Sequence, residues 1–429
     1  MRILLLGSGG REHAITRALR RDPAVTAIHC GPGNAGTAEI AENHVLEVSD
    51  PVSVVELARR LRPDLVVVGP EAPLIAGVSD AVRQNGIPCF GPDAAAATIE
   101  GSKAFAKDIM AAAGVPTATA RVCASAGEVA AALDEFGPPY VVKDDGLAAG
   151  KGVIVTADRA AAERHAAACD RVVVEAYLEG PEVSVFALTD GAHAIPLLPA
   201  QDFKRAYDND EGPNTGGMGA YSPLPWAPPD LAEDVVATVI RPAIAELARR
   251  ETPYSGVLYA GLALTAHGIR VVEFNARFGD PETQVVLDRL ATPLSGLLQE
   301  CAMGGLPAST TLEWRPGAAV TVVVAAENYP AAPVKGDPIA GIDEAEQVPG
   351  AYVLHAGTAR NHEGILISAG GRVLNVVGTG PDLAAARKTA YEAVGKIRMR
   401  GAHHRTDIAA SSPVPPAPPS APAPPYPPS

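Results

Sequence analysis

Two lysines and three glycines are gathered in a short segment that begins at residue 143. A strand-like apolar run over 140–142 leads into Lys143, and the chain continues as Asp-Asp-Gly-Leu-Ala-Ala-Gly-Lys-Gly to residue 152. Glycines let backbone N–H groups turn toward an anion, and two ammonium groups neutralise phosphate oxygens. A solvated turn between two strands is the alternative. The residues that we predict to bind nucleotide phosphate are Lys143, Gly146, Gly150, Lys151 and Gly152.

Two familiar nucleotide-binding motifs are incomplete in this chain. A Walker A loop would need glycine at 145 and a hydroxyl at 152, where the chain has Asp145 and Gly152. The dinucleotide fingerprint G-x-G-x-x-G begins at residue 7 but fails at Glu12. A helix that begins just after this first loop still offers an anion site, with Arg11 nearby, because its backbone donors and dipole face the ligand.

A second group of chemical residues follows a strand-like run near residue 271. The period-2 alternation of Val-Val-Glu-Phe-Asn over 271–275 places Glu273 and Asn275 on one face. A carboxylate and an amide oxygen are the donors that Mg²⁺ accepts from proteins. The alternative is a half-buried strand whose polar face meets water. Arg277 favours the metal site, since its guanidinium suits a developing phosphoryl or carboxyl oxyanion.

The N-terminal part of the chain has the pattern of an alternating α/β domain. Strand-like runs over 3–6, 65–68 and 88–90 alternate with helix-like stretches over 52–61 and 75–85, which predicts βαβ units and a parallel sheet in residues 1–100. Glycine-bearing loops follow its strands. Because ligands of open α/β sheets bind at the carboxyl ends of strands, we expect a substrate-binding domain here.

The remaining chain predicts two further domains and a tail. Residues 101–295 hold both chemical groups, a helix with apolar residues at every fourth position over 231–247, and a hairpin over 256–274. Strand-like runs after 315 and a helix over 381–397 predict a small α+β domain over 315–409. The tail 411–429 is rich in proline, and we expect it to be disordered. The fold class is therefore α/β and α+β, multidomain.

Composition limits the function. The 429 residues carry 35 Lys and Arg against 49 Asp and Glu, a net charge of −14, which argues against a nucleic-acid partner. No segment resembles a secretory signal or a membrane span, and five separated cysteines form no C-x-x-C pair. We expect a cytoplasmic protein with no membrane contact and no obligate protein partner.

In combination, these motifs resemble the ATP-grasp ligases, and among them the phosphoribosylamine–glycine ligase family of purine synthesis. The resemblance covers residues 1 to about 409, and the shared order of motifs is more specific than any one of them. Phe203 stands where many members have histidine, and Ala276 where cysteine is common. The motifs begin at Gly9, Gly69, Gly101, Asp145, Gly212, Glu273 and His355.

The resemblance implies a carbon–nitrogen ligase with an ATP-grasp domain over 101–295 and a flexible lid over about 115–190. Such enzymes use ATP and Mg²⁺, or Mn²⁺, to phosphorylate the carboxylate of glycine. The amine of 5-phosphoribosylamine then attacks the glycyl phosphate, which gives glycinamide ribonucleotide, ADP and phosphate. The glycine-rich loop is expected to exclude water from the acyl phosphate.

The same resemblance assigns roles to individual residues. The ATP-binding set gains Lys103, Glu175, Ala176, Tyr177, Leu178 and Glu182. The metal would be held by Glu273 and Asn275. Catalytic roles are implied for Arg277, Lys151 and Asp202. The implied substrate-binding residues are Gly9, Gly10, Gly33, Asn34, Glu71, Asn214, Thr215, Gly216, Met218 and Arg277.

Other functions remain open from the sequence alone. Another ATP-grasp carboxylate–amine ligase or carboxylase of purine metabolism would share the lysines, Glu273 and Asn275. A nicotinamide oxidoreductase is disfavoured by the incomplete fingerprint, and a noncatalytic nucleotide sensor would have no need of Arg277. His355 ends an apolar strand, where a histidine is more often structural than catalytic.

Overall fold

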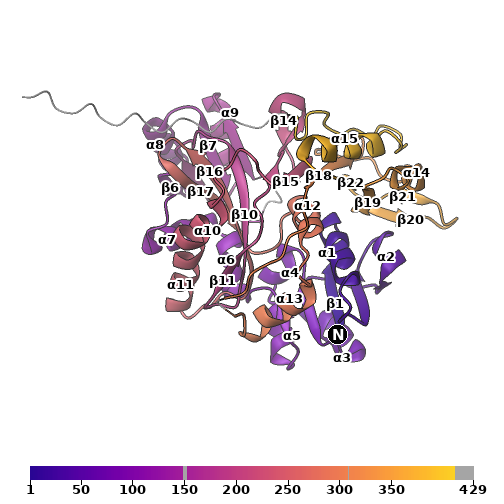
Figure 1. The fold of residues 1–429 in the computed structure, drawn as a ribbon. Coiled ribbons are helices and arrows are strands. Elements are labelled where there is room, and N and C mark those ends of the chain that lie inside the picture. The colour runs from indigo at the N-terminus through magenta and orange to yellow at the C-terminus, as the bar shows by residue number, and fades with distance from the viewer. Residues whose placement is uncertain (148–151, 308, 411–429) are drawn as a thin grey trace, which may run out of the picture.

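The computed structural model describes residues 1–147, 152–307 and 309–410 (Figure 1). The predicted phosphate-loop residues Gly150 and Lys151, and the predicted disordered tail 411–429, lie outside the described residues. Within the described residues, no helix is both long enough and apolar enough to cross a membrane.

The N-terminal segment forms the predicted parallel sheet, in the strand order β3-β2-β1-β4-β5. Residues 3–6 of the central strand are fully buried, as expected for a strand covered on both faces. The helix predicted over 75–85 is instead two, because Gly77 adopts a left-handed φ of +79° between them. The elements are β1 Arg2–Gly7, α1 Gly10–Arg20, β2 Ala27–Pro32, α2 Thr37–Ile40, β3 Glu42–Asn43, α3 Pro51–Leu61, β4 Leu65–Val68, α4 Glu71–Ile75, α5 Val78–Gln84 and β5 Cys89–Phe90.

Residues 120–175 form a small antiparallel sheet with its own core. Its order is β6-β9-β7-β8, and helices α8 and α9 pack against it around buried Leu133, Val142 and Val174. In Figure 1 these elements lie on the opposite side of the molecule from the N-terminal sheet. The elements that lead to and form this unit are α6 Ala94–Gly101, α7 Lys103–Ala113, β6 Ala120–Cys123, α8 Ala126–Phe136, β7 Tyr140–Asp144, β8 Val153–Thr156, α9 Arg159–Ala167 and β9 Val172–Glu175.

A second antiparallel sheet, β11-β10-β16-β17, carries the predicted metal-binding residues. The hairpin predicted from the turn at 266–268 is present, with Thr265 paired to Gly268. Residues 271–275 occupy the end of its second strand. The elements are β10 Glu182–Thr189, β11 Ala194–Pro196, β16 Gly256–Thr265 and β17 Gly268–Asn275.

The helix predicted over 231–247 contains a π-helical turn. Helix α10, Leu231–Val235, and helix α11, Arg241–Arg249, flank the turn Val236–Ile240, in which the N–H of Arg241 bonds to the carbonyl five residues back. Pro242 explains the wider turn, because it has no N–H for the carbonyl four residues earlier. A wider turn also keeps a stripe of every fourth residue on one face, and all five stripe residues are buried.

The C-terminal segment shares a sheet with the middle of the chain. In the order β12-β15-β18-β22-β19, the first two strands come from residues 201–222 and the others from beyond 317. Helix α15 packs on this sheet (Figure 1). The elements are β12 Gln201–Asp202, β13 Arg205–Tyr207, a 3₁₀ turn Asp208–Asp210, β14 Glu211–Asn214, β15 Gly219–Ser222, α12 Glu282–Arg289, α13 Leu294–Met303, β18 Ala318–Ala325, α14 Ile342–Glu346, β19 Ala351–His355, β20 Thr358–Arg360, β21 Leu366–Ser368, β22 Arg372–Gly380 and α15 Leu383–Val394.

Asn34 joins the N-terminal loops to the C-terminal sheet. Its amide nitrogen donates to the carbonyls of Ser8 and His355, both at 2.8 Å. Its side-chain oxygen accepts from the N–H groups of Gly36 and Thr37, both at 2.9 Å. The residue is 7% exposed, so each of these groups would lack a partner without the amide.

The start of α1 is enclosed by the same C-terminal segment. A Cβ on Gly10 would lie 2.2 Å from the amide nitrogen of Asn375, a residue of β22. His13 on α1 accepts a hydrogen bond at Nδ1 from the N–H of His355, at 2.8 Å. The first helix is therefore packed against β19 and β22, and Asn375 leaves no room for a larger residue at position 10.

We predict that Asn34→Ala lowers the free energy of unfolding by about 2–4 kcal/mol, because it leaves several buried donors and acceptors unpaired. Urea denaturation followed by circular dichroism measures the change. The exposed amide of Gln84 offers a control, since Gln84→Ala should change stability by less than about 0.5 kcal/mol. Equal losses in the two variants would contradict the role of Asn34 as a tie between segments.

Candidate active site

A cleft of about 710 Å³ gathers most of the predicted site residues. It is lined by residues of the N-terminal loops, the small antiparallel sheet, the hairpin strand β17 and the segment 201–216. Gly9, Gly10, Gly33, Asn34 and Met218 are not among the lining residues, and Met218 is fully buried. The predicted residues that line the cleft are Glu71, Lys103, Lys143, Gly146, Gly152, Glu175, Ala176, Tyr177, Leu178, Glu182, Asp202, Asn214, Thr215, Gly216, Glu273, Asn275 and Arg277.

Lys143 is held by a buried carboxylate and by the hairpin strand. Its Nζ lies 2.9 Å from Oε2 of Glu175 and donates to the carbonyl of Val272 at 2.8 Å. The other carboxylate oxygen of Glu175 lies 3.1 Å from Nζ of Lys107. Strands β7 and β9 are antiparallel neighbours in which Glu175 is paired with Val141 and Lys143 with Val173, so Lys143 and Glu175 are diagonal neighbours on the sheet. The ammonium group is thus held in a fixed position near the end of β7.

Asp145 attaches the start of that loop to helix α7. Its Oδ1 accepts from the hydroxyl of Ser102 at 2.9 Å and from the N–H of Ala104 at 3.0 Å. Lys103 donates to the carbonyl of Gly146 at 2.9 Å. Burial tends to raise the pKa of Asp145, but these hydrogen bonds and the charge of Arg171 lower it overall. This anchor was not predicted from the sequence, although an acidic residue is unusual in an anion-binding loop.

Glu273 and Asn275 both line the cleft from the end of β17. Burial favours a raised pKa for Glu273, but the charges of Lys204, Lys143 and Lys103 outweigh it, so the pKa is lowered. A deprotonated carboxylate beside an amide oxygen fits a hard divalent cation such as Mg²⁺. Lys204, whose Nζ lies 3.9 Å from Glu273, was not predicted from the sequence.

Arg277 is held by oxygens from three separate elements. Its Nε lies 3.3 Å from Oε2 of Glu71. Its Nη2 lies 3.1 Å from Oε1 of Glu100 and donates to Oδ1 of Asn275 at 3.0 Å. Glu100 was not predicted from the sequence, because no motif in α6 marks it as part of a site. Burial alone would lower the pKa of Arg277, but Glu100 and Glu71 raise it, so the guanidinium stays charged.

Asp202 lies among several charged residues that line the cleft. Removal from water, together with the carboxylates of Glu282, Glu182 and Glu273, raises its pKa to about 7 against the opposing charge of Lys204. Lys204 also pairs with Glu182 at 2.7 Å. A carboxyl group with a pKa near neutrality can accept or release a proton during turnover.

The C-terminal sheet contributes Arg372 to the cleft. Its Nη2 lies 3.1 Å from the carboxylate of Asp280, and its Nη1 donates to the carbonyls of Gly216 and Asp280. Burial tends to raise the pKa of Asp280, but Arg372 and Arg11 lower it overall. No local motif surrounds Arg372, so its place in the cleft follows only from the shared sheet.

His355 lies away from this cleft and is held in the interface with α1. Burial lowers the pKa of His13 to about 3 and that of His355 to about 4. Nδ1 of His355 contacts the hydroxyl of Thr358 at 3.0 Å. Two neutral, packed histidines support the structural role for His355 that the sequence favoured.

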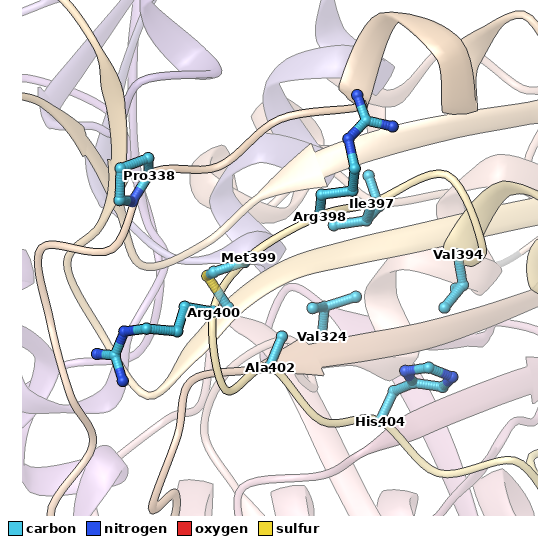
Figure 2. Close-up of a pocket in the computed structure, with 9 residues that line it drawn as sticks. All are labelled: Val324, Pro338, Val394, Ile397, Arg398, Met399, Arg400, Ala402 and His404. Carbon is cyan, nitrogen blue, oxygen red and sulfur yellow. The ribbon is translucent and has the colours of Figure 1, made fainter.

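A second cavity, of about 550 Å³, lies in the C-terminal part between β18, the end of α15 and residues 397–404 (Figure 2). Its two arginines are already paired: Arg398 with Glu344, and Arg400 with Glu327 and Asp337. None of the predicted site residues lines it. The larger cleft is therefore the candidate active site.

Comparison with known proteins gives matches over most of the chain. Three family models match in order: the phosphoribosylglycinamide synthetase N domain at residues 1–100, its ATP-grasp (A) domain at 101–283 and its C domain at 319–411. The chain is 63% identical over 414 residues to the phosphoribosylamine–glycine ligase of Streptomyces coelicolor, covering 96% of this chain and 99% of that one. It is 54% identical over 421 residues to the enzyme of that name from Mycobacterium leprae, covering 96% and 98%.

Solved structures show the same architecture. The crystal structure of phosphoribosylamine–glycine ligase from Thermotoga maritima superposes with a TM-score of 0.82 at 33% identity, covering 95% of this chain and 100% of that chain. The biotin carboxylase domain of the Hydrogenobacter thermophilus 2-oxoglutarate carboxylase, solved with MgADP and bicarbonate, gives a TM-score of 0.71 at 17% identity, covering 94% and 91%. The second likeness is one of fold alone.

The raised pKa of Asp202 predicts a pH-dependent stability. The folded protein holds this proton more tightly than the unfolded chain, so the carboxyl's contribution to stability is complete below its ordinary value of 3.8 and is lost as the pH rises through about 7. Asp202→Asn should therefore be more stable than the wild type above pH 7, with a flatter profile below it. Thermal unfolding across that window measures this, with the exposed Asp234→Asn as control. Parallel profiles for wild type and Asp202→Asn would contradict the raised pKa.

Proposed function

The chain belongs to the phosphoribosylglycinamide synthetase family, and from this premise we propose how its cleft joins glycine to 5-phosphoribosylamine with ATP. The protein is an ATP-dependent carbon–nitrogen ligase of purine biosynthesis. The γ-phosphoryl group of ATP passes to the glycine carboxylate and gives glycyl phosphate and ADP. The amine of phosphoribosylamine then attacks the acyl carbon, phosphate leaves, and glycinamide ribonucleotide is formed.

The charge arrangement of the cleft is the observation that carries this proposal. Four cations line the same cleft as Glu273, and their charges together lower the pKa of its carboxylate: Lys103, Lys143, Lys204 and Arg277. Phosphoryl transfer has little covalent chemistry for a protein to perform, so catalysis depends on positioning and on neutralising phosphate oxygens. Fixed cations near Glu273 can both position the phosphate groups and neutralise their oxygens.

We assign the divalent cation to Glu273 and Asn275. These two donors fit Mg²⁺ because they are hard oxygens from adjacent same-face positions of one strand, and the lowered pKa keeps Glu273 charged. When bound there, Mg²⁺ would neutralise charge on the transferring phosphoryl group. Mn²⁺ accepts the same kinds of donor.

We place the nucleotide along the small antiparallel sheet. Residues 176–178 follow β9 and connect it to the second sheet, so their backbone groups can hydrogen-bond an adenine ring. Glu182 stands at the edge of the cleft and is suited to ribose hydroxyls. Lys103, Lys143 and the glycine loop would take the phosphates; its residues Gly150 and Lys151 are included by sequence only.

We place the reacting groups between Arg277 and Asp202. Three oxygen partners hold Arg277 in a fixed position, so its guanidinium is preorganised for the oxyanion that develops on the acyl carbon. Asp202, with a pKa of about 7, is suited to accept the proton that the attacking amine loses. Glu71 and the segment 214–216 line the same region and are assigned to phosphoribosylamine.

The alternative, another carboxylate ligase or a carboxylase, is not favoured. The carboxylase neighbour shares only 17% identity, which supports the fold and not the substrate. The relative at 63% identity is named for glycine ligation.

We also propose a cytoplasmic location, because all five cysteines are free thiols.

Substrate dependence tests the proposed reaction. We expect ADP release from Mg-ATP only when glycine and freshly generated phosphoribosylamine are both present. Bicarbonate and formate serve as matched alternative donors, and neither should replace glycine. ATP turnover that depends on bicarbonate but not on glycine would contradict the proposed function while leaving the nucleotide site intact.

Glu273→Gln tests the metal assignment. The variant keeps the shape of the side chain but removes the charge, so we expect kcat to fall by about 100-fold or more and the Mg²⁺ requirement to rise, with an unchanged melting profile. Glu313→Gln, at an exposed position outside the cleft, provides the matched control. An unchanged Mg²⁺ titration in the Glu273 variant would remove this residue from the metal site.

A further inference from the structure

Three side chains with metal-binding atoms meet at the edge of the N-terminal sheet, outside the cleft described above. His29 lies on β2, Glu42 lies on the edge strand β3, and His44 follows two residues later. Strands β2 and β3 are parallel, with His29 paired to Glu42. Because side chains two residues apart in an extended chain point the same way, His44 joins Glu42 on that face.

The three donor atoms are already at the spacing of a coordination sphere. Nδ1 of His29 and Nε2 of His44 are 3.0 Å apart, and the carboxylate oxygens of Glu42 lie 3.4 Å from His29 and 3.7 Å from His44. A tetrahedral zinc ion with bonds of about 2.0–2.1 Å places its ligand atoms about 3.3 Å apart. Little rearrangement is therefore needed to fit an ion among them.

The exposure of the group also suits a metal. Both imidazole side chains are 12% exposed and Glu42 is 67% exposed. The exposed carboxylate lets an ion approach from solvent, and water can complete the shell of the ion.

We propose that His29, Glu42 and His44 form a second metal site, which binds a divalent transition-metal ion of the zinc type. Two imidazoles and one carboxylate favour such an ion over Mg²⁺, which prefers oxygen ligands. The bound ion cross-links the two-residue edge strand β3 to β2. Between the two ligands on this segment lies Asn43, whose amide donates to the carbonyl of Asn34 at 2.8 Å. The site thereby stabilises the loop that joins the N-terminal sheet to the C-terminal segment.

The test uses the full-length, tag-free protein after removal of metal by a chelator. Zn²⁺ is titrated in competition with a chromophoric indicator, with Mg²⁺ in large excess so that the Glu273 site does not contribute. We expect one equivalent of Zn²⁺ to bind and to raise the melting temperature. His29→Gln and His44→Gln should each weaken binding by roughly 100-fold, since loss of groups that merely support a ligand costs 10–100-fold.

Two further variants test whether Zn²⁺ binds specifically at this site. His193, half-exposed and 3.3 Å from Asp190, is a histidine–carboxylate pair without a second imidazole, so His193→Gln should leave the affinity unchanged. Glu42→Gln alters an exposed side chain and should fold normally, yet still weaken Zn²⁺ binding. Co²⁺ should give the strong visible absorption of a tetrahedral site in the wild type and lose it in His44→Gln. Unchanged Zn²⁺ affinity in both histidine variants, or no stoichiometric binding by the wild type, would overturn the proposal.

Discussion

The structure depends on a balance of charges that are removed from water in one cleft. Carboxylates such as Glu71 and Glu100 would be costly to bury alone, and so would Arg277, which lies among them. The opposite charges offset each other's cost of desolvation only while the N-terminal sheet, α6 and β17 are held together. In the reaction that we propose, the same balance is useful because fixed cations can neutralise the phosphate and acyl oxygens.

That balance requires segments that are distant in the chain to be locked in place. The sheet that contains β12, β15, β18, β22 and β19 brings both Asp202 and Arg372 to the lining of one cleft. Asn34 and the start of α1 attach the N-terminal loops to the end of β19 and to β22. The C-terminal segment therefore supplies a charged residue to the cleft and also holds the first loops in place.

The two departures from the family pattern have structural explanations. Phe203 lies with its ring 4.9 Å from the guanidinium carbon of Arg405 and 6.2 Å from the ring of Tyr221, so it packs as an aromatic support beside Asp202. Ala276 is buried, and its N–H donates to Glu100 at 2.7 Å, a contact that any residue type could make through its backbone. Neither position brings a side chain that the proposed chemistry requires.

The sequence by itself determined the features that depend on neighbouring residues. Strand alternation places Glu273 and Asn275 on one face, and the apolar run of β1 predicts a buried parallel strand, because backbone geometry sets both periods. The order of motifs identified the family. The tertiary structure alone decided that Glu100, Lys204 and Arg372 join the cleft, since each sits in an ordinary local context and reaches it only through sheet order and helix packing. Local periodicity cannot specify which distant segments become neighbours, and the electrostatics of this site arise between such segments.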